Sequence, residues 1–133
     1  MAKDARQRMV AAAARMISTR GVVPTSMREL AKSGGPLGSI YHYFPDGKEQ
    51  LIDEAIQLVG RHVERLLEHP RQDGTLAAYD AFVDHWRTLL LDSEFQSGCA
   101  VLAVATDGTG QAPRAAASAS RIFRRWQGLL ADQ

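Results

Sequence analysis

The stretch SMRELAKSGGPLGSIYHYF, residues 26–44, decides the fold of this chain. Ser26 and Glu29 have the spacing of a capping box, which predicts that a short helix begins here. Two glycines end that helix, and Pro36 suits the first turn of a second one because its missing N–H costs nothing there. The second helix should run to about Phe44. Two brief helices joined by a glycine turn are typical of a helix-turn-helix, which places its second helix in the major groove of DNA.

The side chains of the second helix fit a contact with nucleic acid. Gly38 permits close approach of the backbone, and Ser39 can bond a base edge or a phosphate. Tyr41 and Tyr43 offer hydroxyl groups to phosphate oxygens, and Lys48 can contact a phosphate together with the positive N-terminus of the next helix. Any helical hairpin with a glycine turn has the same spacing, so the spacing alone leaves both interpretations open.

Helical patterns continue on both sides of this stretch. Asp4 can cap a first helix with apolar residues on one face, and Gly21 stands where a left-handed helix end is expected. Asp46 and Glu49 repeat the capping-box spacing and predict a long helix from this point. Its apolar stripe comprises Leu51, Ala55, Leu58, Val59, His62 or Val63, Leu66 and Leu67.

The remainder of the chain predicts two further helices and one ambiguous segment. One helix is expected from Thr75 and a last one from Pro113, whereas the uniformly apolar residues 98–107 fit a helix or a strand equally well. The sequence has no strand pair, hairpin signal or fixed-period repeat, so the predicted fold class is all-α. The apolar face of the helix from Thr75 comprises Leu76, Tyr79, Phe82, Val83, Trp86, Leu89 and Leu90.

Composition and charge narrow the function classes. Of 133 residues, 45% are apolar and 23% charged, a globular mixture that excludes wholesale disorder. A lone cysteine, Cys99, excludes a disulfide-stapled secreted scaffold. Without an apolar run of ~20 residues or a signal-peptide pattern, we expect a soluble, cytoplasmic protein with no membrane partner. Residues 1–50 carry eight Lys and Arg against four acids, a net +4, and residues 51–133 carry eight against eleven, a net −3, which suggests an anionic partner for the first part.

Several pieces of the first third resemble the N-terminal module of the tetracycline-repressor (TetR) family. They are, in order, AARMISTRG (13–21), TSMRELA (25–31), GSIYHYF (38–44) and KEQL (48–51). The resemblance covers about residues 4–55 and is specific, because separately spaced pieces agree in order. Further on, GCAVLAVATD (98–107), together with PDGK (45–48), is similar to the LmrA/YxaF-type subgroup.

The resemblance implies a ligand-responsive transcriptional repressor that binds a palindromic operator as a homodimer and is released by a small-molecule effector. It implies a three-helix DNA-binding domain over residues 1–47 and a helical effector-binding and dimerisation domain over residues 48–133. Compared with the usual pattern of the family, the chain is one residue shorter between Ala31 and Gly38. It also stops before the helices that usually form the dimer interface, so we expect the second domain to be incomplete at its C-terminus. The positions that match DNA contacts are Ser26, Arg28, Leu37, Gly38, Ser39, Tyr41, Tyr43 and Lys48, and those that match packing positions are Ile40 and Phe44.

Aromatic and soft side chains cluster in the second part of the chain. At helical spacing such residues form plain core more often than a ligand cavity. The resemblance favours a cavity, because induction needs an internal site, and His62 or His85 could place a polar group inside it. The residues that we single out for a small apolar or aromatic effector are Phe82, Trp86, Cys99, Phe123 and Trp126.

Other function classes have less support in the sequence. Cys99 and His85 could be the nucleophile and base of an enzyme, but Cys99 lies in an apolar run that should raise its pKa. No metal-ligand spacing and no glycine-rich phosphate loop is present, so we expect no metal and no cofactor. The alternative that we keep is a helical protein-interaction module without DNA binding. The tyrosines of residues 39–44 argue against it, because beside a basic surface they serve phosphate contact better than burial.

Overall fold

The computed structural model describes residues 2–22, 27–32, 37–69, 74, 76–107, 110 and 112–133. These residues contain helices and no strand, which confirms the predicted all-α class. None of the described helices is both long and apolar enough to cross a membrane. The helices are α1 (Ala2–Arg20), α2 (Met27–Ala31), α3 (Leu37–Tyr43), α4 (Lys48–Glu68), α5 (Ala77–Asp92), α6 (Ala100–Asp107) and α7 (Pro113–Ala131).

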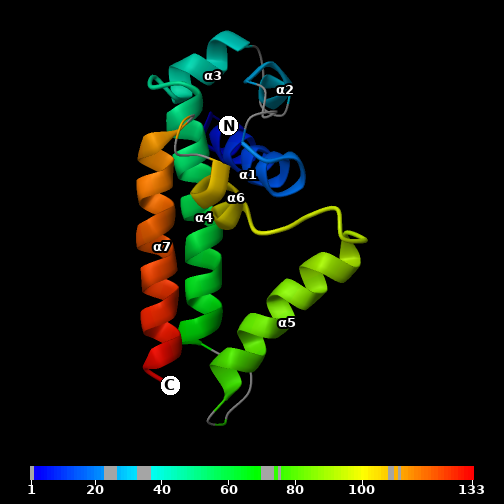
Figure 1. Ribbon diagram of the computed structural model, residues 1–133. Coiled ribbons are helices and arrows are strands. Elements are labelled where there is room, and N and C mark those ends of the chain that lie inside the picture. Colours follow the sequence, from blue (N-terminus) through cyan, green and yellow to red (C-terminus); the bar gives the residue numbers. More distant parts are fainter. Residues whose placement is uncertain are drawn as a thin grey trace.

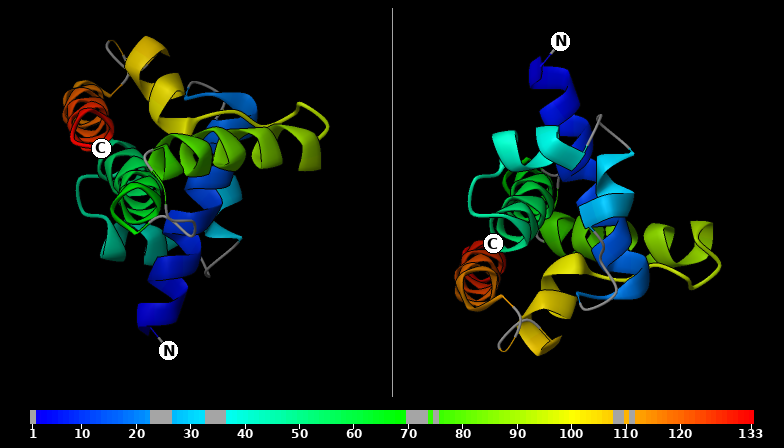
Figure 2. Two further views of the ribbon diagram at one scale, coloured as in Figure 1. Left: turned by 90° about the horizontal axis from the view of Figure 1, so that it is seen from below. Right: turned by 90° about the horizontal axis from the view of Figure 1, so that it is seen from above.

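Helix α4 is the axis of the molecule. Helix α7 lies beside it and runs in the same direction, so that both helices begin toward the end of the molecule where the small helices α2 and α3 lie (Figures 1 and 2). Helix α1 crosses near the start of α4, and α6 packs between α1 and α7. Helix α5 diverges from the far end of α4, and of the other helices it packs chiefly against α4. The short helices α2 and α3 therefore lie at one end of the molecule, and the start of α7 lies lower and to one side, beside α4 (Figures 1 and 2).

The buried residues of the first three helices belong to the same hydrophobic core as those of α4. Met9, Ile17 and Leu30 are fully buried in it, because α1 packs chiefly against α4 and also contacts α2 and α3. Ile40 and Phe44 are also fully buried, as the family resemblance implies for packing positions. The predicted capping box at Ser26, the two glycines and Pro36 lie outside the described residues.

The ends of α1 show one correct prediction and one error. Gly21 has a φ of 84° and donates its N–H to the Ile17 carbonyl oxygen at 2.9 Å, which confirms the left-handed helix end. Asp4 is not a cap, because the helix already begins at Ala2 and Asp4 lies in its first turn. A carboxylate in that position still interacts favourably with the helix dipole.

The capping box predicted for α4 is wrong. Gly47 takes the cap position with a φ of 74°, and no side chain caps the helix. The Asp46 N–H donates instead to the Gln50 side-chain oxygen at 3.0 Å. The Glu49 carboxylate accepts the backbone N–H of Arg114 at 2.7 Å, so it caps the first turn of α7 rather than its own helix.

The buried face of α4 is also rotated from the predicted stripe. Leu58, Val59 and Leu66 are half-buried, whereas Ile52 and Ile56 are almost completely buried. Two helices, α1 and α7, cover α4 from different sides, so its buried surface is wider than a single stripe. The full buried set is Leu51, Ile52, Asp53, Ala55, Ile56, Gly60, Val63 and Leu67.

Helix α5 departs most from its predicted packing. Only Ala77 and Ala78 are buried, while Tyr79 and Val83 are 43% and 54% exposed. The predicted apolar face is therefore only partly covered, because α5 swings away from the α4–α7 pair (Figure 1). The ambiguous segment 98–107 is resolved as α6, which begins at Ala100.

Candidate functional site

Helix α3 stands at the outer end of the molecule, beyond the starts of α4 and α7 (Figure 1). Tyr41 is 50% exposed there, and its ring lies beside the turn at Gly47 that leads into α4. Tyr43 is half-buried and makes an edge contact with the His42 ring at 5.5 Å between centroids. The Tyr41 side chain is thus presented to solvent, whereas the Tyr43 ring packs against the neighbouring His42 ring.

Of the other residues predicted to contact DNA, the structure describes some with their side chains and others only in part or not at all. Arg28 is exposed on α2, which packs against α3, and Lys48 is half-buried in the first turn of α4. Burial lowers the pKa of Lys48. The backbone of Leu37, Gly38 and Ser39 forms the first turn of α3, and their side chains are not among those described. Ser26 lies outside the described residues altogether.

Two arginines that the sequence analysis missed hold this end together. Arg6 of α1 lies over the Phe44 ring, 4.7 Å from its centroid, and pairs with Glu54 of α4 at 2.7 Å. Arg20, at the end of α1, pairs with Glu29 of α2. These contacts fix α1 against α2, α4 and the end of α3, and no local sequence pattern signals them, because the partners lie on different helices.

Comparisons with known proteins agree with this geometry. Residues 9–55 match the family profile described as bacterial regulatory proteins, tetR family, and residues 75–133 match the C-terminal domain of LmrA/YxaF-like transcriptional regulators. An HTH-type transcriptional regulator of Mycobacterium tuberculosis is 37% identical over 134 residues, covering 96% of this chain and 68% of the relative. The chain belongs to the TetR family.

Two Bacillus subtilis regulators extend the comparison. The HTH-type transcriptional regulator YxaF is 27% identical over 131 residues, which cover 96% of this chain and 69% of YxaF. The HTH-type transcriptional regulator LmrA is 36% identical over 63 residues, which cover 47% of this chain and 34% of LmrA. This TetR-family chain is thus a helix-turn-helix transcriptional regulator of the LmrA/YxaF-like type, as the sequence motifs implied.

Four aromatic residues of the second part gather around one cleft. All five residues singled out from the sequence line it, and its volume is about 350 Å³. Trp126 forms the floor at 3% exposure, and its ring centroid lies 6.2 Å from Phe82, 6.0 Å from Trp86 and 5.4 Å from Phe123. The lining residues are Phe82, Trp86, Cys99, Leu102, Phe123, Trp126, Gln127 and Leu130, and none of them is charged. We call this set the aromatic cleft.

The thiol in the aromatic cleft is not poised for nucleophilic chemistry. Burial raises the pKa of Cys99, as its apolar surroundings predict, although backbone hydrogen bonds from Val101 and Leu102 oppose that rise. His85, the base considered in the sequence, lines a different cavity. Within the described part of the chain, no group of three or more His, Cys, Asp or Glu side chains is arranged to hold a metal ion.

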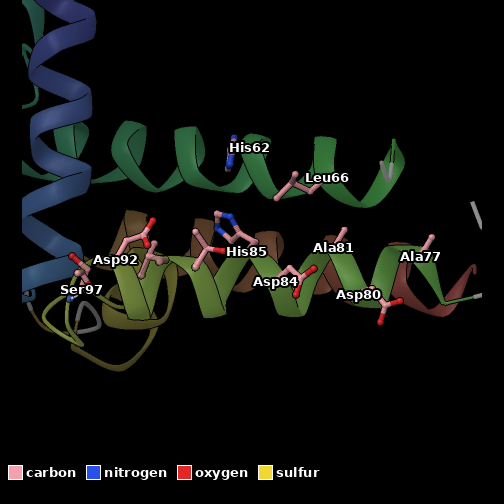
Figure 3. A pocket seen from close by; sticks show the side chains of 12 residues that line it. His62, Leu66, Ala77, Asp80, Ala81, Asp84, His85, Asp92 and Ser97 are labelled. Carbon is pink, nitrogen blue, oxygen red and sulfur yellow. Dashed lines mark hydrogen bonds between the residues drawn. The ribbon is translucent and has the colours of Figure 1, made fainter. Parts of the chain in front are cut away.

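A second cavity of about 680 Å³ lies in the angle between α4 and α5. Figure 3 shows His85 and Asp92 directed from α5 toward α4, where His62 and Leu66 stand. The two imidazole rings are 5.2 Å apart, and burial together with the nearby His62 lowers the pKa of His85. The carboxylates of Asp80, Asp84 and Asp92 also line this cavity, and they suit a polar or positively charged group better than an anion. This cavity thus differs in chemistry from the aromatic cleft.

Proposed function

We propose that this chain is a ligand-responsive repressor that binds a palindromic operator as a homodimer and is released when a small apolar or aromatic molecule enters the aromatic cleft. The observation that carries the proposal is the pairing of a TetR-family DNA-binding module with a cleft lined by five residues chosen from the sequence alone. We divide the chain into a DNA-binding domain, residues 1–47, and an effector-binding and dimerisation domain, residues 48–133.

The proposed DNA contacts are of two kinds, contacts with phosphates and contacts with base edges. Tyr41 and Lys48 bond phosphates, and the exposure of Tyr41 and the position of both residues at the outer end support that role. The first turn of α3 reads base edges in the major groove, with two copies presenting it about one helical turn, ~34–36 Å, apart. The complete proposed set is Ser26, Arg28, Leu37, Gly38, Ser39, Tyr41, Tyr43 and Lys48.

The proposed effector is an uncharged, aromatic molecule. The volume of the aromatic cleft falls at the lower end of the range for small-molecule sites, roughly 300–1,000 Å³. Its walls are ring edges and aliphatic groups, and its thiol stays neutral, so a charged ligand would find no partner there. Helices α5 and α7 both line the cleft, so an occupant that separates them changes the position of α7 relative to the DNA-binding end. No cofactor takes part, and a regulator of this kind acts in the cytoplasm, beside the chromosome.

The test is selection from random duplexes followed by titration. The protein should enrich a palindromic sequence, and apolar aromatic molecules should lower its affinity for that sequence by about 5- to 150-fold. Enrichment of no sequence would favour the helical interaction module instead. Enrichment without a response to any saturating aromatic ligand would contradict induction through the aromatic cleft.

A further inference from the structure

Arg114, in the first turn of α7, bonds to three carboxylates, one in the turn before α4 and two on the first two turns of α4. Its backbone N–H donates to Glu49 at 2.7 Å, its Nε to Asp53 at 3.2 Å and a terminal guanidinium nitrogen to Asp46 at 3.1 Å. We propose that Arg114 is a positioning residue for DNA recognition, which locks the start of α7 onto the turn behind α3 and so fixes the angle of α3 to the rest of the molecule. The inference rests on the proposed operator binding.

The position of the three acceptors supports this role. Asp46 lies in the four-residue turn between the end of α3 at Tyr43 and the start of α4 at Lys48. Glu49 and Asp53 follow on the first two turns of α4. One side chain of α7 therefore holds both the DNA-binding end and the helix on which that end is mounted, and a shift of α7 along α4 must move or break these bonds.

The bond to Asp53 makes the contact more than a surface ion pair. Asp53 is 3% exposed, and one of its carboxylate oxygens has no hydrogen-bond partner within the described residues. The other oxygen accepts hydrogen bonds from Arg114 and from Gln57 at 3.1 Å. A buried carboxylate needs such a partner, because an unpaired charge inside a protein is strongly unfavourable. The exposed Asp46 pair alone would contribute little.

The same helix connects this contact to the aromatic cleft. Phe123 and Trp126 line the cleft from α7, and Arg114 stands about 18 Å before Trp126 at the rise of an α-helix. Packed helices shift as rigid units more readily than they bend. Helix α7 thus offers a direct route from the cleft to the turn behind α3, in addition to α4, which joins the two parts through the chain itself.

A rival role for Arg114 is a direct contact with DNA phosphate, since its side chain is half exposed and lies near the same end. The two roles predict opposite effects for Asp46→Asn. Loss of a negative charge near DNA strengthens phosphate binding, whereas loss of the bond to Arg114 loosens the DNA-binding end. Replacement of Arg114 by alanine also distinguishes the positioning role from the phosphate contact, because the salt dependence of binding falls only when a phosphate contact is lost.

The experiment measures affinity for the selected operator and for duplexes with one base pair inserted or deleted between the half-sites. Wild-type protein should reject the altered spacings, and Arg114→Ala and Asp46→Asn should each reduce that discrimination about tenfold while the salt slope stays unchanged. Arg124→Ala is the matched control, because it removes the same charge from an exposed position of α7. Amide hydrogen exchange of residues 44–51 in the free protein should rise in Arg114→Ala and stay unchanged in Arg124→Ala.

The outcomes distinguish this role from the proposed function. Wild-type protein that selects no duplex contradicts operator binding, while the exchange measurement still reports whether Arg114 holds the turn. Unchanged spacing discrimination in Arg114→Ala, a salt slope reduced by about one, or stronger operator binding by Asp46→Asn would each overturn the positioning role.

Discussion

The indole N–H of Trp126 donates to the backbone carbonyl oxygen of Gly60 at 3.2 Å, which ties the floor of the aromatic cleft to the middle of α4. The approach is close because Gly60 has no side chain. A Cβ added there would lie 3.1 Å from the Ile122 side chain, tighter than ordinary van der Waals contact. The glycine that helix propensity disfavours therefore suits the close packing of α7 against α4.

Gly60→Ala should lower the free energy of unfolding by about 1–3 kcal/mol, because the added methyl group separates α4 from α7. Urea denaturation measures it. Gly128→Ala is the matched control, since that glycine is also helical but a methyl group added to it would meet no neighbouring atom within 4 Å. The control should gain up to ~1 kcal/mol from helix propensity alone. A Gly60→Ala variant as stable as Gly128→Ala would show that the two helices are not tightly packed.

Phe123→Ala should weaken binding of the uncharged dye N-phenyl-1-naphthylamine to the aromatic cleft by about tenfold, because one wall of apolar contact is removed. Dye fluorescence, which rises in apolar surroundings, gives the dissociation constant. Phe95→Ala provides the comparison, since Phe95 is 69% exposed and does not line the cleft. Equal dye affinity of both variants would place the binding elsewhere.

Lys48→Ala should weaken binding to every duplex sequence by a similar factor and reduce the salt slope by about one, because a phosphate contact is sequence-independent. Fluorescence anisotropy at several salt concentrations measures both quantities. Lys3→Ala, an exposed change at the start of α1, should leave the slope unaltered. A salt slope of Lys48→Ala identical to that of wild type would remove Lys48 from the proposed DNA contacts. Ser39→Ala, by contrast, should alter the DNA sequence that the protein prefers.

The stability of the protein should fall on mild acidification partly through His85. Burial and His62 lower the pKa of His85 in the folded state, so below the ordinary value of about 6.5 the unfolded chain binds a proton more readily. The stabilising contribution is complete above that value and is lost as the pH falls through the folded pKa. His85→Gln should therefore lose less stability between pH 7 and pH 5 in urea titrations than wild type, and an equal loss in the two proteins would contradict this role of His85.

Local patterns in the sequence predicted much of this architecture. The all-α class follows from helical periodicity and the absence of strand and hairpin signals, and the end of α1 at Gly21 and the start of α7 at Pro113 follow from glycine and proline chemistry near the helix ends. Helical spacing alone favours plain core for Phe82, Trp86, Cys99, Phe123 and Trp126, and the family resemblance favours a cavity; the structure brings all five to one cleft.

The wrong predictions occur where a tertiary contact with a distant residue replaces the local contact that the sequence pattern predicts. Asp46 and Glu49 have capping-box spacing, but Arg114, 65 positions beyond Glu49, takes both carboxylates. Similarly, the apolar pattern of α5 does not indicate how far that helix diverges from α4. Because it diverges, Tyr79 and Val83 are exposed rather than buried. Sequence periodicity defines which face is apolar, and only tertiary packing decides how much of that face is covered.

The central claim is sequence-specific operator binding by the end of the molecule that carries α3. Its most direct test is fluorescence anisotropy of the protein with the selected palindromic duplex and with a scrambled duplex of equal length at the same salt concentration. We predict a dissociation constant at least about 10³-fold lower for the palindrome. Equal affinity for the two duplexes, or binding to neither, would contradict the account.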